Sequence, residues 1–467
     1  MEPQNIDMKL DVVILAAGKG TRMHSDLPKV LHRIGGRSML ENVIVAAEKL
    51  GNICLHLVIG YGGEQIKQHV ALSVDVDSIN WAIQEPQLGT GHAVQQTVAA
   101  LNSNNTDNLV LVLYGDVPLI KTTTLGKLLS LANAETLSLL TLITDDPTGL
   151  GRIIRGDGNA ITAIVEEKDA SAEQREIKET NSGIMAIPTI KLVRWLGELK
   201  NHNAQGEYYL TDIIAMAAKE NCKIVAEVIE DDFEVQGVND KSQLASLERH
   251  YQMNKVDDLL AAGVTLRDPA RVDIRGELEI GKDVEIDINA IFEGEIILGN
   301  GVIVGANVII KDSVIGDGSV ILPGSNIDGG IIGKNVSIGP YARIRPGTVL
   351  KDNVKIGNFV ETKNAIIGKG SKASHLAYIG DAEIGEDVNI GAGTIVCNYD
   401  GINKHKTRIG NNVFVGSNSV LVAPLELADN AFIAAGSTIN RDVPVDNLAI
   451  GRGKQRNIPG WKRPVKK

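Results

Sequence analysis

Two glycines and two cations lie close together in the segment LAAGKGTRMHSDLPK, residues 15–29, and together they could hold a phosphate. Gly18 and Gly20 allow the backbone to bend closely around phosphate oxygens and to present N–H groups to them. Arg22 and Lys29 add positive charge where phosphate charge has to be neutralised. The segment is not a Walker A loop, because glycine follows its first lysine where that motif has serine or threonine. We therefore predict a phosphate site of another type.

A carboxylate follows a strand-like apolar run in the segment NLVLVLYGDVP. Asp116 lies just past this run, and ligands of open α/β sheets bind at the carboxyl ends of the strands. Carboxylate oxygens suit Mg²⁺, a hard cation that prefers oxygen ligands. Alone, such an aspartate is as often a turn or cap residue as a metal ligand. Together with the glycine loop, it is better interpreted as a ligand.

The complete loop, ending in Pro28 and Lys29, resembles the signature of the sugar-phosphate nucleotidyltransferases. The segments QEPQLGTGHA, LYGDVP, GLGRI, IVEEKD, TNSGI and GVND follow in the order of that family's pattern, except that Leu150 stands where an aromatic residue is expected. The resemblance implies that a sugar-1-phosphate oxygen attacks the α-phosphorus of UTP and that pyrophosphate leaves. It implies Arg22 and Lys29 as catalytic charges, and Mg²⁺ on Asp116 and Asn239. The residues that it implies to bind UTP or the UDP-sugar are Leu15, Ala16, Ala17, Gly18, Lys29, Gln84, Gly89, Thr90, Tyr114, Gly115, Asp116, Gly151, Glu166, Asn181 and Asn239.

A second polar set lies in the segment NFVETKNAIIGKGSKASHLAYIG. It contains Glu361, Lys363, His375 and Tyr378. A lone histidine is more often structural than catalytic, but the polar surroundings favour catalysis here. With an ordinary pKa of about 6.5, a histidine can take a proton from an amine that attacks a thioester. We expect Glu361 to orient the His375 ring and to stabilise its protonated form.

The elements that position these residues differ between the two halves of the chain. Up to about residue 240, short apolar runs such as DVVILAA alternate with helical patterns such as SMLENVIVAAEKLG, in which Ser38 and Glu41 form a capping box. This alternation predicts an α/β domain with an open, mainly parallel, Rossmann-like sheet.

From about residue 264, an aliphatic residue recurs at every sixth position, usually followed by glycine, as in IGKDVE, VGANVI and IGEDVN. A chain that runs straight, turns a corner and repeats on three sides would place each aliphatic residue above the one a coil below. We expect a triangular prism of about 10 coils with about 18 residues in each. On such a coil, residues 361 and 378 lie almost one turn apart. The pattern resembles the left-handed parallel β-helix of the hexapeptide-repeat acyltransferases. The rhythm stops at CNYDGINKHKTR, residues 397–408, which we interpret as a functional insertion.

Residues 241–262 read as one helix that links the two halves. We therefore predict a uridylyltransferase domain at residues 1–240, a helical linker at 241–262 and a β-helix acetyltransferase domain at 263–467.

This combination of halves resembles the bacterial bifunctional uridylyltransferase/acetyltransferases that make UDP-N-acetylglucosamine. The resemblance implies a homotrimer with the acetyl site between subunits, where acetyl-CoA acetylates glucosamine-1-phosphate before uridylyl transfer. It implies His375 as general base, Asn398 as an aid to the transition state, and Lys404 reaching an adjacent site. The residues implied to hold the acetyl acceptor are Arg345, Lys363, Tyr378 and Asn389, and those implied to hold acetyl-CoA are Ala392, Asn398, Tyr399, Ser417, Ala435 and Arg452.

The net charge of −11 argues against a nucleic-acid partner, and no apolar run is long enough to span a membrane. Cys54, Cys222 and Cys397 lie far apart and form no C-x-x-C pair, so we expect neither a disulfide framework nor a zinc site, and a reducing cytoplasm is the expected location. Two alternatives stay open. One is a nucleotidyltransferase with a single activity and a purely structural β-helix, and the other is a regulatory homologue without activity.

Overall fold

The structure, a computed structural model, describes residues 10–103 and 106–466. The chain divides into two compact units, and the division falls between Tyr251 and Gln252. This point lies inside helix α9 (Lys241–Ala261), so one helix contributes to both units.

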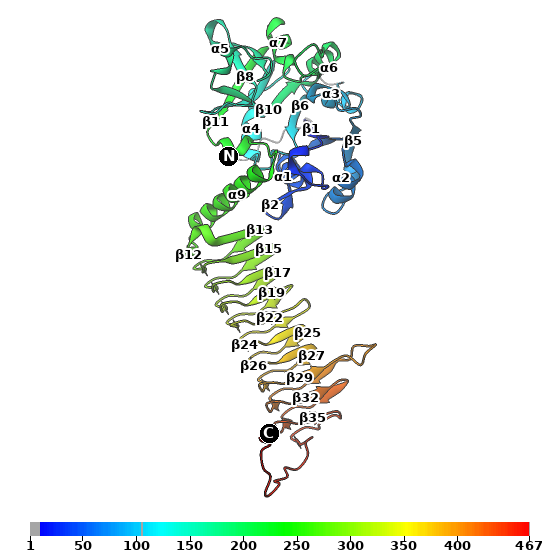
Figure 1. Cartoon of the computed structure of the whole chain (residues 1–467), viewed down its shortest axis with the longest axis vertical. Coiled ribbons are helices and arrows are strands. Elements are labelled where there is room, and N and C mark those ends of the chain that lie inside the picture. The colour runs from blue at the N-terminus through cyan, green and yellow to red at the C-terminus, as the bar shows by residue number, and fades with distance from the viewer. Residues whose placement is uncertain (1–9, 104–105, 467) are drawn as a thin grey trace. The chain divides into compact units, whose positions relative to one another are not determined.

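One sheet forms the centre of the first unit, with the strand order β11–β7–β10–β6–β1–β4–β5 (Figure 1). Strand β10 runs antiparallel to β6 and β7, whereas the other neighbours along this path are parallel, so the predicted mainly parallel sheet is confirmed. The strands of this unit are β1 (Leu10–Ala16), β2 (Arg33–Ile34), β3 (Arg37–Ser38), β4 (Ile53–Ile59), β5 (Ile79–Ile83), β6 (Leu109–Tyr114), β7 (Thr136–Ile143), β8 (Arg152–Arg155), β9 (Ile161–Val165), β10 (Glu179–Pro188) and β11 (Lys223–Ile229).

Helices pack on both faces of this sheet, which explains why β1 is apolar almost throughout. Val12 and Ile14 belong to a core that includes α1 and α4, while Val13 belongs to a core that includes α3, α6 and α7. The α-helices are α1 (Met39–Glu48), α2 (Gly63–Val70), α3 (Thr90–Gln95), α4 (Thr122–Leu131), α5 (Ala172–Arg175), α6 (Thr189–Glu198), α7 (Asp212–Lys219) and α8 (Asp232–Val235), and short 3-10 turns include η1 (Thr21–Met23) and η2 (Lys29–Leu31).

The predicted capping box begins helix α1. The Glu41 N–H donates to Ser38 Oγ at 3.2 Å, and the Ser38 N–H donates to Glu41 Oε2 at 2.8 Å. Both donors belong to the group of N–H groups that a helix start leaves without an intrahelical partner. The box therefore fixes where α1 leaves the hairpin of β2 and β3.

The second unit is a stack of coils with parallel strands, which confirms the β-helix prediction (Figure 1). One sheet follows the order β12 (Thr265–Leu266), β14 (Glu285–Ile286), β16 (Ile303–Val304), β18 (Val320–Ile321), β21 (Ser337–Ile338), β24 (Lys355–Asn358), β26 (Lys372–His375), β28 (Asn389–Ile390), β31 (Phe414–Val415), β34 (Phe432–Ile433) and β36 (Leu448–Ala449). The other contains β13 (Val272–Ile280), β15 (Ala290–Leu298), β17 (Ile309–Ile315), β19 (Asn326–Asp328), β20 (Ile331–Ile332), β22 (Arg343–Ile344), β23 (Val349–Leu350), β25 (Glu361–Ile367), β27 (Tyr378–Ile384), β29 (Ile395–Cys397), β30 (Thr407–Ile409), β32 (Val420–Val422), β33 (Leu425–Leu427) and β35 (Thr438–Ile439).

Aliphatic residues stack from coil to coil, as the six-residue rhythm predicts. Ile321 pairs with Ile338 and Ile338 with Ile356, and all three are fully buried. Corners are turned by residues in the left-handed region, such as Asn289 and Asn307, whose side chains also bond to each other at 3.0 Å.

The insertion lengthens one coil of this stack. Ile384 pairs with Ile409, 25 residues later, whereas Ile367 pairs with Ile384 after 17 residues (409 − 384 and 384 − 367). Within the extra chain, Tyr399 and Lys404 form an antiparallel bridge. The insertion is therefore a short hairpin that projects from the stack.

Within residues 10–103 and 106–466, no helix combines the length and the apolarity that are needed to cross a membrane.

Candidate active sites

A cavity of about 260 Å³ lies in the first unit at the carboxyl ends of β1 and β6. Ligands of open α/β sheets bind at such a position, where the strand order reverses. The cavity brings together ten residues predicted to bind UTP or to neutralise its charge. Its lining residues are Leu15, Ala16, Ala17, Gly18, Lys29, Val30, Gln84, Gln87, Gly89, Thr90, Ala93, Tyr114, Asp116 and Glu207.

Lys29 stands between the two predicted metal ligands. Its ammonium forms an ion pair with Asp116 Oδ2 and donates to Asn239 Oδ1 at 3.3 Å. Side-chain exposure is 12% for Lys29 and 20% for Asp116, so the charges are partly shielded from water. Two oxygens thus converge on one positive charge. A carboxylate and an amide oxygen form a donor set that fits a hard divalent cation.

The glycine loop has the tight geometry expected of it at one position. Gly20 has a φ of +59°, and a Cβ there would lie 2.6 Å from Lys29 Cβ. Only glycine accepts both the conformation and the contact. Arg22, the other predicted catalytic charge, is exposed in η1 and does not belong to the residues that line this cavity.

The loop at residues 84–90 contains three residues predicted to bind UTP, Gln84, Gly89 and Thr90, and side-chain amides hold it in place against the glycine loop. Gln84 is 5% exposed and donates to Gly89 O at 2.9 Å, while Gln87 donates to Ala17 O at 2.7 Å. Gly89 has a φ of +104°, and a Cβ there would meet Tyr208 O at 2.7 Å. The loop is therefore fixed before any base enters.

Three further residues of the set predicted to bind UTP or the UDP-sugar, Gly151, Glu166 and Asn181, also come together. The Asn181 N–H donates to Gly151 O at 2.8 Å, and a Cβ on Gly151 would lie 3.6 Å from the Glu166 carboxylate. Burial raises the pKa of the Glu166 carboxyl, and the charges of Asp169 and Glu207 add to this effect against a hydrogen bond from Thr211 at 2.8 Å.

Tyr114 lines the cavity and is also influenced by Glu166, so it links the nucleotide cavity to the group of Gly151, Glu166 and Asn181. The Gly115 N–H donates to Leu15 O at 2.9 Å, which holds the end of β6 beside the glycine loop. Burial raises the pKa of the Tyr114 hydroxyl, with further contributions from the charges of Glu166 and Asp116. This hydroxyl therefore stays neutral near pH 7.

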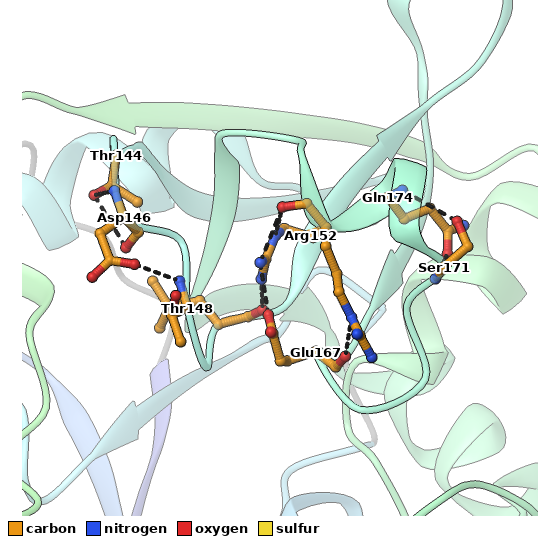
Figure 2. A network of polar contacts seen from close by, with 9 residues as sticks. Thr144, Asp146, Thr148, Arg152, Glu167, Ser171 and Gln174 are labelled. Atoms are coloured by element: carbon orange, nitrogen blue, oxygen red, sulfur yellow. Dashed lines mark hydrogen bonds and ion pairs between the residues drawn. The ribbon is translucent and has the colours of Figure 1, made fainter.

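A buried arginine supports the loop that carries Gly151 (Figure 2). Arg152 is 2% exposed, bonds to Leu150 O, and donates from two nitrogens to Arg175 O at 3.3 Å. It also pairs with Glu167 Oε2 at 2.6 Å. From the sequence, Glu167 reads as a plain surface charge, and the structure instead makes it the counter-ion of a buried guanidinium.

In the second unit, the expected proximity of Glu361 and Tyr378 is confirmed, because the two residues are paired in register on β25 and β27. Arg345 and Lys363 occupy equivalent positions on adjacent coils of the same sheet. Arg345 donates to Glu361 Oε1 at 2.8 Å. The structure therefore places two cations and a tyrosine on one face, a suitable surface for a sugar phosphate.

The partner of His375 differs from the one we expect. Its Nδ1 lies 2.7 Å from Asn358 Oδ1, one coil below, while the Glu361 carboxylate is bonded to Arg345. The expected contact of Glu361 with the ring is replaced because the 17-residue register sets Asn358 opposite His375 and Tyr378 opposite Glu361. His375 is exposed at the end of β26.

Asn398 is held by a buried carboxylate that the sequence did not single out. Asp381 accepts hydrogen bonds from Asn398 and, at 2.6 Å, from Asn364 Nδ2. Burial opposes ionisation of Asp381, but these two bonds and the charges of Lys363 and Lys404 outweigh it and lower its pKa. A side-chain hydrogen bond with Lys363, and then the charge of Lys363, lower the pKa of Lys404.

The insertion hairpin is closed by its own aspartate. Asp400 accepts from the Asn403 N–H at 2.6 Å, the Ile402 N–H at 2.8 Å and the His405 ring at 2.7 Å. These bonds, with the first the strongest cause, lower the Asp400 pKa. Tyr399 is exposed beside them.

Three residues predicted to bind acetyl-CoA form a column at one corner of successive coils. The Asn418 N–H donates to Ala392 O at 2.7 Å, and the Gly436 N–H donates to Ser417 O at 2.8 Å. The third, Ala435, accepts from the Arg452 guanidinium at 2.6 Å, so Arg452 adjoins this column. Asn389, which is predicted to hold the acetyl acceptor, lies on β28 in a different sheet from Lys363 and Tyr378, and it pairs in register with Lys372.

Sequence reasoning missed five polar site residues, and all of them except Glu207, which lines the cavity, have hydrogen-bond partners that are distant in sequence. They are Gln87, Glu207, Asn358, Asn364 and Asp381. Asn358 and Asp381 each lie 17 residues from their partners, His375 and Asn398 (375 − 358 and 398 − 381). Polar residues one coil apart are the signal that could have found them.

Known protein families match segments in both halves of the chain. A family described as the MobA-like NTP transferase domain matches residues 12–151, one described as the GMPPB C-terminal domain matches residues 274–360, and the bacterial transferase hexapeptide (six repeats) matches residues 406–441. A solved nucleotidyl transferase from Methanothermobacter thermautotroptrophicus covers 52% of this chain and 97% of its own, at 15% identity and with a TM-score of 0.37.

Relatives match along almost the entire chain. The bifunctional protein GlmU of Stutzerimonas stutzeri is 54% identical and covers 98% of this chain and 100% of its own. Those of Marinobacter nauticus and Pseudomonas syringae pv. syringae are 54% and 55% identical, and each covers 98% of this chain and 99% of its own. The prediction of an enzyme that joins a nucleotidyltransferase to a hexapeptide-repeat transferase is confirmed, and the alternatives with one activity or none are not favoured. The chain belongs to the family of the bifunctional protein GlmU.

Proposed function

We propose that this chain carries out two successive transfers in the synthesis of UDP-N-acetylglucosamine. Acetyl-CoA acetylates glucosamine-1-phosphate on the second unit, and the product then takes a uridylyl group from UTP on the first unit. The observation that carries the proposal is the presence of two separate groups of suitable chemistry in one chain. Lys29 contacts Asp116 and Asn239 beside the cavity, and His375 is held by Asn358 in the coils.

For uridylyl transfer, the chain's own contribution is positioning and charge. The phosphate oxygen of the sugar attacks the α-phosphorus, the bond to the β-phosphate breaks, and pyrophosphate carries the charge away. Lys29 lies where it can neutralise this charge, and the fixed loop of Gln84 and Gly89 orients the base. We propose that Asp116 and Asn239 hold Mg²⁺, which supplies further positive charge to the phosphates when bound. Arg22 is exposed on η1, from which we propose that it reaches the phosphates.

For acetyl transfer, the amine nitrogen attacks the thioester carbonyl while its proton passes to His375. The carbon–sulfur bond then breaks, and the CoA sulfur leaves as a thiolate that recovers the proton. The Asn358 Oδ1 atom can only accept, so His375 Nδ1 carries the ring proton and donates it to this oxygen. The lone pair on Nε2 is therefore available for the proton of the amine. Asn398 stabilises the carbonyl oxygen, and Arg345 and Lys363 hold the sugar phosphate. We assign Glu361 to the positioning of Arg345, with which it is paired.

We propose a homotrimer because the residues assigned to the acetyl site are spread over two sheets of the coils. Arg345, Lys363 and Tyr378 lie on one sheet, whereas His375 and Asn389 lie on the other, and His375 is exposed. A neighbouring copy would enclose these residues, and Lys404 on the projecting hairpin would reach the site of that copy. We also propose domain boundaries at residues 240 and 262, a cytoplasmic location, and no nucleic-acid or membrane partner. The molar mass in solution tests the trimer.

Two variants separate the proposed activities. Asp116→Ala should lose pyrophosphate release from UTP and keep CoA release from acetyl-CoA, and His375→Ala should do the reverse. A mixture of the two variants should then convert glucosamine-1-phosphate, acetyl-CoA and UTP to the UDP-sugar, because each supplies the other's missing step. Loss of both activities in either variant, or failure of the mixture, would contradict two independent sites.

A further inference from the structure

Three side chains with metal-binding atoms meet at the amino-terminal ends of β1 and β4, away from the nucleotide cavity at the carboxyl ends. Asp11 pairs in register with Cys54, and Val13 pairs with His56. Because side chains alternate along a strand, Asp11, Cys54 and His56 all point to the same face of the sheet. One ligand atom from each residue lies within 4.8 Å of the others.

The cluster is buried and its polar groups are only partly satisfied. Asp11 is 1% exposed and His56 is not exposed at all. The His56 Nε2 lies 2.9 Å from Asp11 Oδ1, and Asp11 Oδ2 accepts from the Asn102 N–H at 3.1 Å. Among the residues that the structure describes, the buried His56 Nδ1 finds no hydrogen-bond partner. A buried ring nitrogen of this kind usually has one, so its isolation points to a missing ligand.

The cysteine supplies both a soft ligand and access. Cys54 is half-buried, in contrast to its two neighbours, and its Sγ accepts from Asn80 Nδ2 at 3.1 Å. Asn80 lies on β5 and pairs in register with His56 on β4, so the adjacent strand carries a fourth polar side chain. An ion can therefore reach the sulfur from solvent while the carboxylate and the imidazole stay buried.

We propose that Asp11, Cys54 and His56 bind Zn²⁺. A thiolate, an imidazole and a carboxylate are its usual ligands, at bonds of about 2.0–2.3 Å, which place the ligand atoms about 3.5 Å apart in a tetrahedron. The ligand atoms already lie within 4.8 Å of one another, so a contraction of no more than about 1.3 Å would close the set around the ion. Binding releases the thiol proton to solvent, and the carboxylate and thiolate then balance the two charges of the ion. A neutral set is the form that burial tolerates best.

The sequence gives no sign of this site because its ligands come from two strands. Cys54 and His56 are two residues apart, and Asp11 joins them only through the pairing of β1 with β4. The site is also chemically different from Asp116 and Asn239, which offer oxygen alone. Sulfur ligation therefore provides a signature that the nucleotide site cannot produce.

Cobalt substitution tests the proposal on the full chain. The metal-free protein is titrated with Co²⁺, and a thiolate bound to Co²⁺ gives a charge-transfer absorption in the near ultraviolet. We expect this band to saturate at one Co²⁺ per chain, to vanish on addition of Zn²⁺ and to be lost in Cys54→Ser. Cys222→Ser and Cys397→Ser are matched controls that should keep it. No band at saturating Co²⁺, or an undiminished band in Cys54→Ser, would overturn the proposal.

Zinc affinity gives a second measurement that does not depend on cobalt. Competition with a chromogenic chelator should show Zn²⁺ binding that weakens by more than about tenfold in Cys54→Ser, since one of three protein ligands is lost. Zn²⁺ should also raise the unfolding temperature of the parent protein and leave that of Cys54→Ser unchanged. Cys54 is half-buried, so this variant should fold. Equal affinity and an equal thermal shift in both proteins would refute the site.

Discussion

Asn358 and His375 lie opposite each other on neighbouring coils, and Asn358 Oδ1 is 2.7 Å from His375 Nδ1. An amide oxygen only accepts, so the bond fixes the proton on Nδ1 and leaves the Nε2 lone pair to act as base. We predict that Asn358→Ala lowers kcat for acetyl transfer by about 10–100-fold, because the ring loses its tautomer and orientation. The KM for both substrates should change little.

Asn358→Asp provides the control for this prediction, because a carboxylate keeps an acceptor at the same place. It should restore most of the rate that Asn358→Ala loses. Uridylyl transfer, measured as pyrophosphate release by the same samples, should equal that of the parent protein. A rate unchanged in Asn358→Ala would show that the bond has no catalytic importance.

The second prediction concerns Lys29, whose ammonium lies between Asp116 and Asn239. Lys29→Ala should reduce kcat for uridylyl transfer by about 10²–10³-fold, the usual effect of removing one group that neutralises charge in a transition state. Lys19→Ala removes an exposed lysine from the same loop and should have almost no effect. Initial rates of pyrophosphate release at saturating UTP measure both. Similar losses in the two variants would indicate a general effect of loop charge instead.

The sequence revealed those parts of the molecule whose physical cause is local. The six-residue rhythm predicts the coils because each coil repeats the same corner and the same buried position. The capping box of Ser38 and Glu41 is visible because its two residues are three apart, as the first turn of a helix requires. The glycine loop is contiguous, so its phosphate chemistry can be inferred from composition and order.

The remainder depends on partners that the fold brings together. The pairing of Asn358 with His375 needs the register of two coils, and the expectation for Glu361 failed because only the approximate coil length could be inferred. The burial of Arg152 depends on carbonyls at Leu150 and Arg175, which no pattern marks. These contacts are long-range, and each becomes visible only when strand order is known.

The third prediction uses the acid titration of Glu41. Burial alone would raise its pKa, but hydrogen bonds from Ser73, Ser38 and His69 outweigh burial and lower the pKa from 4.5 to about 2. Because the folded-state pKa lies below the unfolded one, the ionised form stabilises the fold above pH 4.5, and this stability is lost as pH falls from 4.5 towards 2. Glu41→Gln should therefore cost about 1–3 kcal/mol at pH 7 and almost nothing near pH 2.

Glu48→Gln is the matched control for Glu41→Gln, since Glu48 is an exposed carboxylate at the other end of α1. A negative charge at a helix C-terminus is slightly unfavourable, so its removal should leave stability unchanged or raised by a few tenths of a kcal/mol. Denaturant unfolding followed by circular dichroism between pH 3 and pH 7 measures both variants. A difference between Glu41→Gln and the parent protein that does not shrink at low pH would contradict the titration argument.

The last prediction concerns Asp381, which holds Asn398 and Asn364 at the base of the insertion hairpin. Its pKa is lowered, with the bonds from both amides and the charges of Lys363 and Lys404 outweighing burial, so the carboxylate is ionised throughout the neutral range. Asp381→Asn keeps the shape but removes the charge that faces two ammonium groups. We expect acetyl transfer to fall by about tenfold or more, because Asn398 loses its charged acceptor and is no longer held in place. Uridylyl transfer and the thermal unfolding of the first unit should not change.

Glu383→Gln is the control for Asp381→Asn, because it removes a neighbouring surface carboxylate that is paired with Lys406 and Arg408. This variant should retain acetyl transfer. Equal losses in the two variants would mean that the net charge of this face, and not the orientation of Asn398, limits the reaction.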